Sequence, residues 1–324
     1  MVEKNEPLTN ENTRLRPKTS FDGPVLKLDF PSIEIGTAEY EEGPTGCTVF
    51  YFPKGANSVV DIRGGMSVTT ESSLLEDGVV SAICFAGGNR WGLEAVTGVS
   101  AQIFSTIDYA GGHRVRGAVI YDFGVRDNKI YPDKELGRAA MKSAQSGVFP
   151  LGSVGAGRSA TVGKFLRKPY QAEPGGQGAA FYQEGPTKIA VFAVVNSLGA
   201  IIDRAGKVVR GHLNSDTGKR EKASDVLKLN PDSKGQIANI SGNTTLTVVA
   251  INQKMDLDDL RQLSRQVHSS MARAIDPFHT TFDGDVLYAV TTNEVENSDL
   301  KNHVISYLAS EVAWDAVLSC CQDQ

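Results

Sequence analysis

The chain is organised around one stretch, Ser241-Gly242-Asn243-Thr244-Thr245-Leu246-Thr247-Val248-Val249-Ala250-Ile251. β-Branched residues dominate it from Thr244 onward, which predicts a buried strand over 244–251. The residues before the strand have ordinary turn chemistry, so one interpretation is a turn that leads into a strand. In the other, the Asn243–Thr244 peptide bond breaks. Thr244 then becomes a new N-terminus, with a nucleophilic hydroxyl and an α-amine that acts as its general base.

Composition sets the class of protein. The chain has 324 residues, of which 40% are hydrophobic and 22% charged, so it can bury a core of full size. A net charge of −5, without a basic patch interleaved with aromatic residues, argues against a nucleic-acid partner. No apolar run approaches the length of a membrane span, and the first 20 residues lack the apolar segment of a secretory signal. We therefore expect a cytoplasmic protein with a disordered leader over 1–20 and a single domain over 21–324.

Apolar periodicity predicts the secondary structure. Period-2 or continuous apolar runs predict strands at 25–30, 33–40, 47–52, 59–63, 117–123, 178–182, 189–195, 244–251 and 286–292. Helical spacing predicts helices at 90–107 and 136–144, a third that Asp256 caps and Pro277 closes, and a fourth that Ser298 caps. Residues 213–240 are polar and predict a flexible connection that runs into Asn243. This order predicts two sheets face to face, covered by helices on both outer sides.

Two possible sites are set aside. The segment 152–163 is rich in Gly and Ala, but Phe165 follows Lys164, so the ending Gly-Lys-Ser/Thr of a phosphate-binding loop is missing. His268 lies within a predicted helix, where a lone histidine is more often structural than catalytic, and no Gly-x-Ser-x-Gly motif supplies a serine for it. The four cysteines lack the spacing of metal ligands, so we expect no metal and no cofactor.

The sequence Asp283-Gly284-Asp285 enters a predicted strand and is more informative. Carboxylates at i and i+2 point to the same side, and their crowding raises the pKa of at least one unless a cation neutralises them. A turn with two surface acids is the alternative. A metal pair lacks a third ligand nearby.

These groups fit around a cleaved Asn243–Thr244 bond. Thr244 supplies the hydroxyl, and its α-amine, with a reference pKa of about 7.7–8.0, can be neutral near neutral pH. A carboxylate orients the hydroxyl and the amine. Lys164 and Asn196 supply charge and hydrogen-bond donation where negative charge develops on the carbonyl oxygen.

Several stretches together resemble those of one peptidase family, the L-aminopeptidase/D-esterases and β-peptidyl aminopeptidases, over about residues 34–317. The nearest likeness is to the endo-type 6-aminohexanoate-oligomer hydrolases, or nylon-oligomer hydrolases. The stretches are Tyr40-Glu41-Glu42-Gly43-Pro44-Thr45-Gly46, Asp61-Ile62-Arg63-Gly64-Gly65, Ala118-Val119-Ile120-Tyr121-Asp122-Phe123, Tyr131-Pro132-Asp133-Lys134, Gly155-Ala156-Gly157, Gly242-Asn243-Thr244-Thr245, Gln266-Val267-His268-Ser269-Ser270-Met271, Pro277-Phe278-His279-Thr280 and Asp283-Gly284-Asp285.

The resemblance implies a fold and an assembly. The fold is a four-layer αββα sandwich of the α/β class, like that of N-terminal-nucleophile hydrolases. Autocleavage between Asn243 and Thr244 would leave a large chain, 1–243, and a small chain, 244–324, that stay together. The resemblance also implies a homo-oligomer, a tetramer.

The resemblance further implies the site residues. By position, the family's nucleophile falls on Thr244, its carboxylate pair on Asp283 and Asp285, its lysine on Lys164 and its asparagine on Asn196. Tyr121 matches a tyrosine placed near the oxyanion in relatives.

Three functions remain open. The first is hydrolysis of linear or cyclic amide oligomers of the 6-aminohexanoate type, which a threonine nucleophile favours because many aminopeptidase members have serine. The second is release of N-terminal residues from peptides by an aminopeptidase or β-peptidyl aminopeptidase. The third is an uncleaved binding protein with the same fold, because a fold alone does not give a function.

Overall fold

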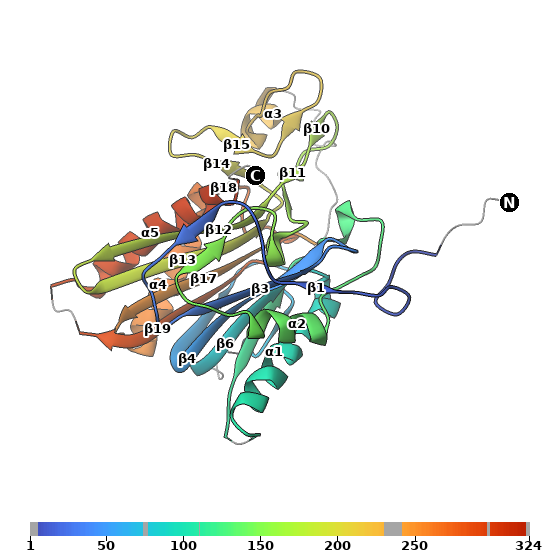
Figure 1. Ribbon diagram of the computed structural model, residues 1–324. Helices are drawn as coiled ribbons and strands as arrows, with labels where there is room; N and C mark the ends of the chain where they lie inside the picture. The colour runs from blue at the N-terminus through green and yellow to red at the C-terminus, as the bar shows by residue number, and fades with distance from the viewer. Residues whose placement is uncertain (1–5, 74–76, 110, 230–241, 297–298, 322–324) are drawn as a thin grey trace.

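A long β-sheet forms the frame of the computed structural model (Figure 1). The structure describes all residues except 1–5, 74–76, 110, 230–241, 297–298 and 322–324. One half of the sheet contains β12 (Gly176–Glu184), β13 (Thr187–Asn196), β17 (Thr244–Gln253) and β19 (Val286–Val295). The other half contains β1 (Pro17–Lys18), β3 (Glu34–Tyr40), β4 (Thr45–Ile62), β5 (Thr69–Thr70), β6 (Gly78–Ala86) and β7 (Val115–Val119). The two halves meet where β19 pairs with β4.

The strand order places β17 in the centre of its half. The sheet runs β12-β13-β17-β19-β4-β6-β7-β5, with β3 beside β4 and β1 beside β3. The pairs β17–β19 and β6–β7 are parallel, and the other pairs of this sheet are antiparallel. All ten residues of β17 are buried, as its continuous apolar and β-branched sequence predicted.

An apolar layer lies between the two halves of the sheet. Phe50 from β4 packs against Phe192 from β13, with ring centroids 5.0 Å apart. Phe85 from β6 packs against Tyr288 from β19 at 6.1 Å. These four rings are 0–1% exposed, so the sheet folds over to enclose a core of its own.

Helices cover the two outer faces. Helices α4 (Leu257–Ser270) and α5 (Asn302–Ser319) pack on one half, and α1 (Leu93–Thr106) and α2 (Lys134–Lys142) pack on the other, as Figure 1 shows. Side chains alternate along each strand: Phe192 faces the inner layer and Val191 faces the helices. The layers are therefore helix, sheet, sheet and helix, which confirms the predicted αββα sandwich. Asp256 caps α4, as predicted, by accepting a hydrogen bond from the backbone of Asp259.

Short elements surround the sandwich. The short paired strands are β2 (Val25–Lys27) with β8 (Val148–Pro150), β9 (Thr161–Val162) with β11 (Glu173–Pro174), β10 (Tyr170–Gln171) with β16 (Leu213–Asn214), and β14 (Ala200–Ile202) with β15 (Val208–Arg210) and β18 (Ile275–Asp276). The short helices are α3 (Ala223–Leu229), η2 (Asn89–Gly92), η3 (Phe123–Val125), η4 (Gly155–Gly157) and η6 (Met271–Arg273). In Figure 1, α3, β10, β14 and β15 lie together at the top of the view.

Two predicted elements are wrong in detail. The strands expected at 47–52 and 59–63 are parts of one strand, β4, whose pairing with β6 shifts register between Tyr51 and Ala56. Pro53 lies in that irregular part, where its missing N–H costs no ladder hydrogen bond. The connection expected over 213–240 contains β16 and α3, and Val226 of α3 packs against Leu166. Residues 230–240 of that segment, and the predicted cap Ser298, lie outside the described residues.

The N-terminal segment differs from the disordered leader that we expected over 1–20. Residues 6–20 lie against the domain, and β1 within them pairs with β3. The side chain of Asn10 hydrogen-bonds the backbone N–H and C=O of Tyr131, at 3.0 Å each. Polar composition hid these contacts, because they are made by an amide and by backbone groups rather than by apolar side chains.

Within the described residues, no helix combines the length and the apolar character needed to cross a lipid bilayer.

Candidate active site

The ends of two neighbouring strands bring Thr244 and Asn196 together. Thr244 is the first residue of β17 and Asn196 is the last residue of β13, and they are directly paired across the antiparallel ladder. Both are buried, at 5% and 1% exposure. Because β17 starts at Thr244, as predicted, this hydroxyl lies beside the side-chain amide of Asn196.

The carbonyl oxygen of the Asn243–Thr244 peptide bond accepts two hydrogen bonds. The Thr244 hydroxyl donates a 2.5 Å hydrogen bond to the carbonyl oxygen of Asn243. The backbone N–H of Gly284 donates a second, 2.7 Å hydrogen bond to the same oxygen. A nucleophile thus lies against a carbonyl whose oxygen is already held by a backbone donor, which is the geometry of an oxyanion site.

Gly284 is required to be glycine by this close approach. A Cβ atom at this position would lie 2.7 Å from the Thr244 hydroxyl oxygen and 2.8 Å from the carbonyl oxygen of Met66. Real Cβ atoms essentially never come that close to another heavy atom. The residue between the two aspartates therefore lets the loop before β19 approach Thr244.

Asp283 is completely buried and held by three donors. Its carboxylate accepts hydrogen bonds from the backbone N–H of Leu198 at 3.2 Å and from the N–H and hydroxyl of Thr280 at 3.0 and 2.5 Å. Burial, followed by the negative charge of Asp285, raises the pKa of Asp283 above its ordinary value. The alternative of two surface acids is wrong, because both aspartates are 0% exposed.

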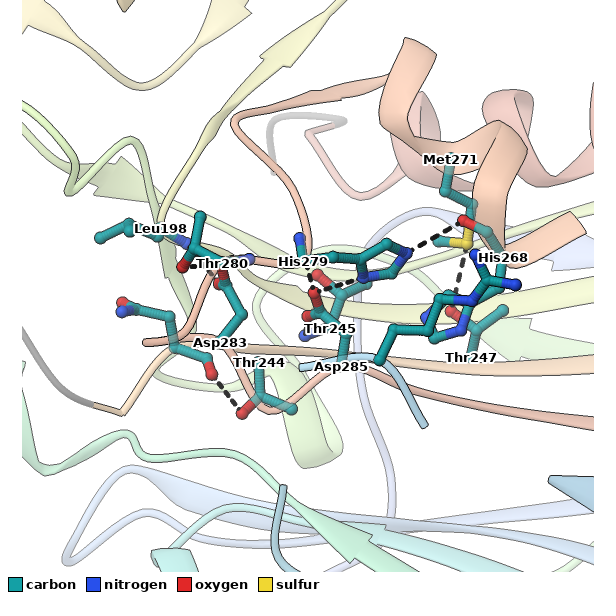
Figure 2. A network of polar contacts seen from close by, with 12 residues as sticks. Leu198, Thr244, Thr245, Thr247, His268, Met271, His279, Thr280, Asp283 and Asp285 are labelled. Atoms are coloured by element: carbon teal, nitrogen blue, oxygen red, sulfur yellow. Dashed lines mark hydrogen bonds and ion pairs between the residues drawn. The ribbon is translucent and has the colours of Figure 1, made fainter. Parts of the chain in front are cut away.

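Asp285 fixes the backbone just after the Asn243–Thr244 bond. One carboxylate oxygen accepts a 2.7 Å hydrogen bond from the backbone N–H of Thr245. The other accepts hydrogen bonds from the backbone N–H of His279 at 3.2 Å and from its Nδ1 at 2.9 Å. Figure 2 shows His279 between this aspartate and His268. Asp285 therefore connects Thr245 to the loop that precedes β19.

The ring of His279 faces acceptors on both sides. Its Nδ1 lies 2.9 Å from the Asp285 carboxylate, and its Nε2 lies 3.3 Å from the carbonyl oxygen of His268. A carbonyl oxygen can only accept, so Nε2 must carry a proton for this second bond to form. The ring therefore bridges the Asp285 carboxylate and the backbone at the end of α4.

His268 is structural, as expected. It is 0% exposed, and its Nδ1 lies 2.8 Å from the carboxylate of Asp61, which also pairs with Arg63 at 2.6 Å. Burial lowers the pKa of His268 to about 4, so the ring is neutral near neutral pH. Both its carbonyl oxygen and its ring contact His279: the oxygen lies 3.3 Å from Nε2, and the two rings pack edge-on with centroids 4.3 Å apart.

Lys164 and Asn196 form one hydrogen-bonded unit. The Lys164 ammonium lies 3.0 Å from the backbone oxygen of Asn196 and 3.1 Å from its side-chain oxygen. The same side-chain oxygen accepts from the backbone N–H of Thr161, and the amide nitrogen donates to the carbonyl oxygens of Tyr121 and Gly242. Burial lowers the pKa of Lys164 to about 7, and the charge of Asp283 only partly opposes this.

Tyr121 lines a cavity that reaches Asn243. The cavity has a volume of about 230 Å³, and its lining includes Tyr121, Lys164, Gly242 and Asn243. Gly242 has a φ of 95°, and a Cβ there would lie 2.6 Å from the Tyr121 ring, so only glycine fits. The ring is 37% exposed.

The structure brings all six predicted site residues and Asn243 into one connected network of contacts. Three further participants were missed: the N–H of Gly284, the ring of His279 and the hydroxyl of Thr280. Gly284 lies between the two predicted aspartates, so its position was a usable signal. His279 and Thr280 lie in a stretch that matched the family, Pro277-Phe278-His279-Thr280, but their contacts could not be predicted because they depend on how the loop 277–285 folds back. Within the described residues, no group of three or more His, Cys, Asp or Glu side chains could hold a metal ion.

Solved structures define the class of fold. The structure of an L-aminopeptidase D-Ala-esterase/amidase from Ochrobactrum anthropi, described as a new variant of the Ntn hydrolase fold, matches with a TM-score of 0.64 and 15% identity. The match covers 93% of this chain and 88% of the other. The chain therefore has the N-terminal-nucleophile hydrolase fold.

The family follows from sequence comparison. The chain belongs to peptidase family S58, whose family model matches residues 28–323. It is 42% identical to a 6-aminohexanoate-oligomer endohydrolase of Agromyces sp. (strain KY5R), over 95% of this chain and 89% of that protein. It is 33% identical to an uncharacterized aminopeptidase of Mycobacterium leprae (strain TN), over 78% and 72% of the two chains. The family resemblance read from the sequence is confirmed, and the chain is a member of a family of amide hydrolases.

Proposed function

We propose that this chain cleaves itself between Asn243 and Thr244 and then hydrolyses amide bonds with the N-terminal Thr244. One observation carries the proposal: the Thr244 hydroxyl lies 2.5 Å from the Asn243 carbonyl oxygen, which also accepts the Gly284 N–H. A hydroxyl aimed at its own preceding carbonyl, with a donor already on the oxygen, is arranged for attack on that carbonyl.

Self-cleavage proceeds in two steps. The Thr244 oxygen attacks the Asn243 carbonyl carbon, and the negative charge that develops on the carbonyl oxygen is held by the Gly284 N–H. The C–N bond then breaks, the proton lost by the attacking hydroxyl is transferred to the nitrogen, which becomes the Thr244 α-amine, and an ester joins Asn243 to the Thr244 oxygen. Water hydrolyses this ester, which leaves a carboxylate on Asn243 and a free hydroxyl on Thr244.

Cleavage also changes the surroundings of Asn196. In the uncut chain its amide nitrogen donates to the carbonyl oxygens of Tyr121 and Gly242. When the new end of the large chain moves away, the bond to Gly242 is released and one N–H becomes available. That N–H then points toward the space vacated by Asn243 and can hold the oxyanion of a substrate amide.

Catalysis on a substrate uses the same groups. The neutral Thr244 amine accepts the proton of its own hydroxyl, the oxygen attacks the substrate carbonyl, and water later hydrolyses the acyl-enzyme. Asp285 keeps the new N-terminus in place through the N–H of Thr245, and Asp283 holds the adjoining loop. Lys164 orients Asn196, and because its pKa is lowered to about 7, the amine is partly uncharged near neutral pH.

The substrate class that we propose is linear amide oligomers of the 6-aminohexanoate type. The 42% identical relative carries that activity in its name, and the two chains match over most of their lengths. The second candidate function is that of an aminopeptidase, because a relative that carries this name is 33% identical to the chain. An N-terminally blocked oligomer separates the two, because an endo-acting hydrolase cuts it internally and an aminopeptidase cannot release its first residue.

An intact-mass measurement tests the mechanism. Wild-type protein is expected to give two chains of 243 and 81 residues, and Thr244→Ala a single chain of 324 residues. A single uncut wild-type chain that still hydrolyses amides would overturn the mechanism. We also propose that the protein is a homotetramer, for which light scattering at several concentrations gives the mass directly.

A further inference from the structure

A second cavity adjoins the one at Asn243. It has a volume of about 460 Å³, and Tyr121 lines both cavities. This volume lies within the usual range for small-molecule sites, about 300–1,000 Å³. The two cavities therefore meet at one side chain, next to the peptide bond that carries the proposed chemistry.

Aromatic rings line the second cavity. Trp91, Tyr121, Phe123 and Tyr131 all contribute to it. Phe123 touches Trp91 edge-on with centroids 6.1 Å apart and Tyr121 at 5.8 Å, so three rings form a continuous surface. Trp91 is 54% exposed. A half-exposed tryptophan at the edge of an aromatic surface is typical of a binding site, because its apolar area gains from being covered.

The N-terminal segment forms one wall of this cavity. Thr9 and Glu11 line it. The segment is anchored on both sides of these residues: the backbone oxygen of Leu8 accepts a 2.7 Å hydrogen bond from the N–H of Lys129, and the Asn10 side chain bonds the backbone of Tyr131. Residues 8–11 are therefore held against the domain by hydrogen bonds to Lys129 and Tyr131.

Charged groups stand at the rim. Glu11 and Lys129 both line the cavity and both are exposed, so they provide one charge of each sign. The Lys129 ammonium lies 5.7 Å from the centre of the Phe123 ring. An apolar aromatic floor with opposite charges at its edge suits a ligand that is aliphatic along its length and charged or polar at intervals.

We propose that this cavity is a substrate subsite that binds the repeat unit next to the scissile amide, an aliphatic segment of an extended amide chain. The inference rests on the proposed function, because it places the scissile bond at Thr244. The chain passes from the Asn243 cavity across Tyr121, and its methylene groups lie on the rings of Tyr121 and Trp91, which are 37% and 54% exposed. The wall of residues 8–11 closes the outer side, so the N-terminal segment contributes to substrate binding.

A rapid-mixing experiment tests the subsite before turnover. The probe is the linear 6-aminohexanoate tetramer, mixed with the wild-type protein as purified while tryptophan emission is followed over the first milliseconds. Covering Trp91 is expected to shift its emission to shorter wavelength, and the shift is expected to disappear in Trp91→Phe. The second tryptophan, Trp314, donates to the Ile202 carbonyl and lies between Arg204 and Arg273, so it reports little. Turnover of the tetramer with unchanged Trp91 emission would overturn the proposal.

Kinetics give a second readout. Trp91→Ala is expected to lower the ratio of kcat/KM for the tetramer to kcat/KM for the dimer about tenfold, mostly through KM, because only the longer chain covers the ring. Asn10→Ala, which releases the wall, is expected to lower the same ratio by a smaller factor. Tyr307→Ala is the matched control, because Tyr307 is 59% exposed on α5, away from the cavity. Equal losses on dimer and tetramer would refute the subsite.

The two proposals fail separately. If intact mass shows no cut at Asn243–Thr244, the mechanism is wrong, and the emission measurement still decides whether the cavity binds the tetramer. If processing is normal and neither Trp91 variant separates long from short oligomers, the subsite is wrong and the mechanism stands.

Discussion

Replacing Gly284 by alanine tests the oxyanion geometry most directly. The new methyl group would start 2.7 Å from the Thr244 hydroxyl oxygen and 2.8 Å from the Met66 carbonyl oxygen, whereas an ordinary contact needs at least 3.4 Å. Either the hydroxyl rotates off the Asn243 carbonyl, or the Gly284 N–H leaves the oxygen that it now holds at 2.7 Å.

Both adjustments slow self-cleavage. Removing one oxyanion donor typically costs about 10²–10³ in rate, and a displacement of about 1 Å in a reacting group costs about 10². We therefore expect the half-time of processing of Gly284→Ala to increase at least about 100-fold. Overpacking of this kind also destabilises a fold by about 1–3 kcal/mol, which a domain of this size tolerates.

The assay is cell-free synthesis followed by gel and intact-mass analysis at timed intervals, so that processing is seen from its start. Gly112→Ala is the matched control, because no atom lies within 4 Å of a Cβ at that position. Thermal melting monitored by circular dichroism shows whether Gly284→Ala remains folded. If it is folded and is processed within about threefold of the wild-type rate, the reasoning about Gly284 is refuted.

Three further predictions concern groups around Thr244. Lys164→Met, made in the uncut Thr244→Ala protein, is expected to raise the free energy of unfolding at pH 6, because a lysine pKa lowered from 10.5 to about 7 means that burial penalises the charged form. The gain is at most about 5 kcal/mol, and the loss of the two hydrogen bonds to Asn196 reduces it. Between pH 7 and 10.5 the unfolded lysine protein binds more protons than the folded one, so the extra stability of the Lys164→Met variant should shrink as the pH rises through that window. Urea unfolding at pH 6, 7.5 and 9 measures this, and a stability difference that stays constant would contradict the prediction. Asn196→Ala is expected to lower kcat about 10²–10³-fold with little change in KM, and a change confined to KM would exclude an oxyanion role. His279→Ala is expected to slow processing about tenfold or more, and His279→Asn, whose amide can still donate to Asp285, should recover part of the rate in the same timed assay; equal rates for the two variants would show that this hydrogen bond does not matter.

The core elements were predictable because local sequence and tertiary packing agree there. The run from Thr244 to Ile251 is β-branched and apolar, and it is fully buried at the centre of one half of the sheet. The stripe on α4 and its Asp256 cap were likewise read from spacing alone. Where a strand bends, the same signals fail: the strand predicted over 47–52 ended before Pro53, whereas the structure accommodates this proline within β4 by a shift in register.

Site residues divide in a similar way. The two aspartates, Lys164 and Asn196 could be nominated because their residue types match the chemistry of amide hydrolysis and because they match a family pattern. His279 could not, since its contact with Asp285 depends on a loop that folds back and on a backbone carbonyl from α4. The wall made by residues 8–11 was missed for a related reason: polar segments can be held by hydrogen bonds that composition does not show.

The sequence by itself determined the strand that starts at Thr244, the layers of the sandwich and the family, because periodicity and residue type are local properties. Tertiary structure decided the chemistry at the bond. The backbone N–H of Gly284, contributed by a loop about 40 residues away, holds the Asn243 carbonyl oxygen. Every residue except proline carries the same backbone N–H, so residue type does not show where this donor points, and only the folded chain does.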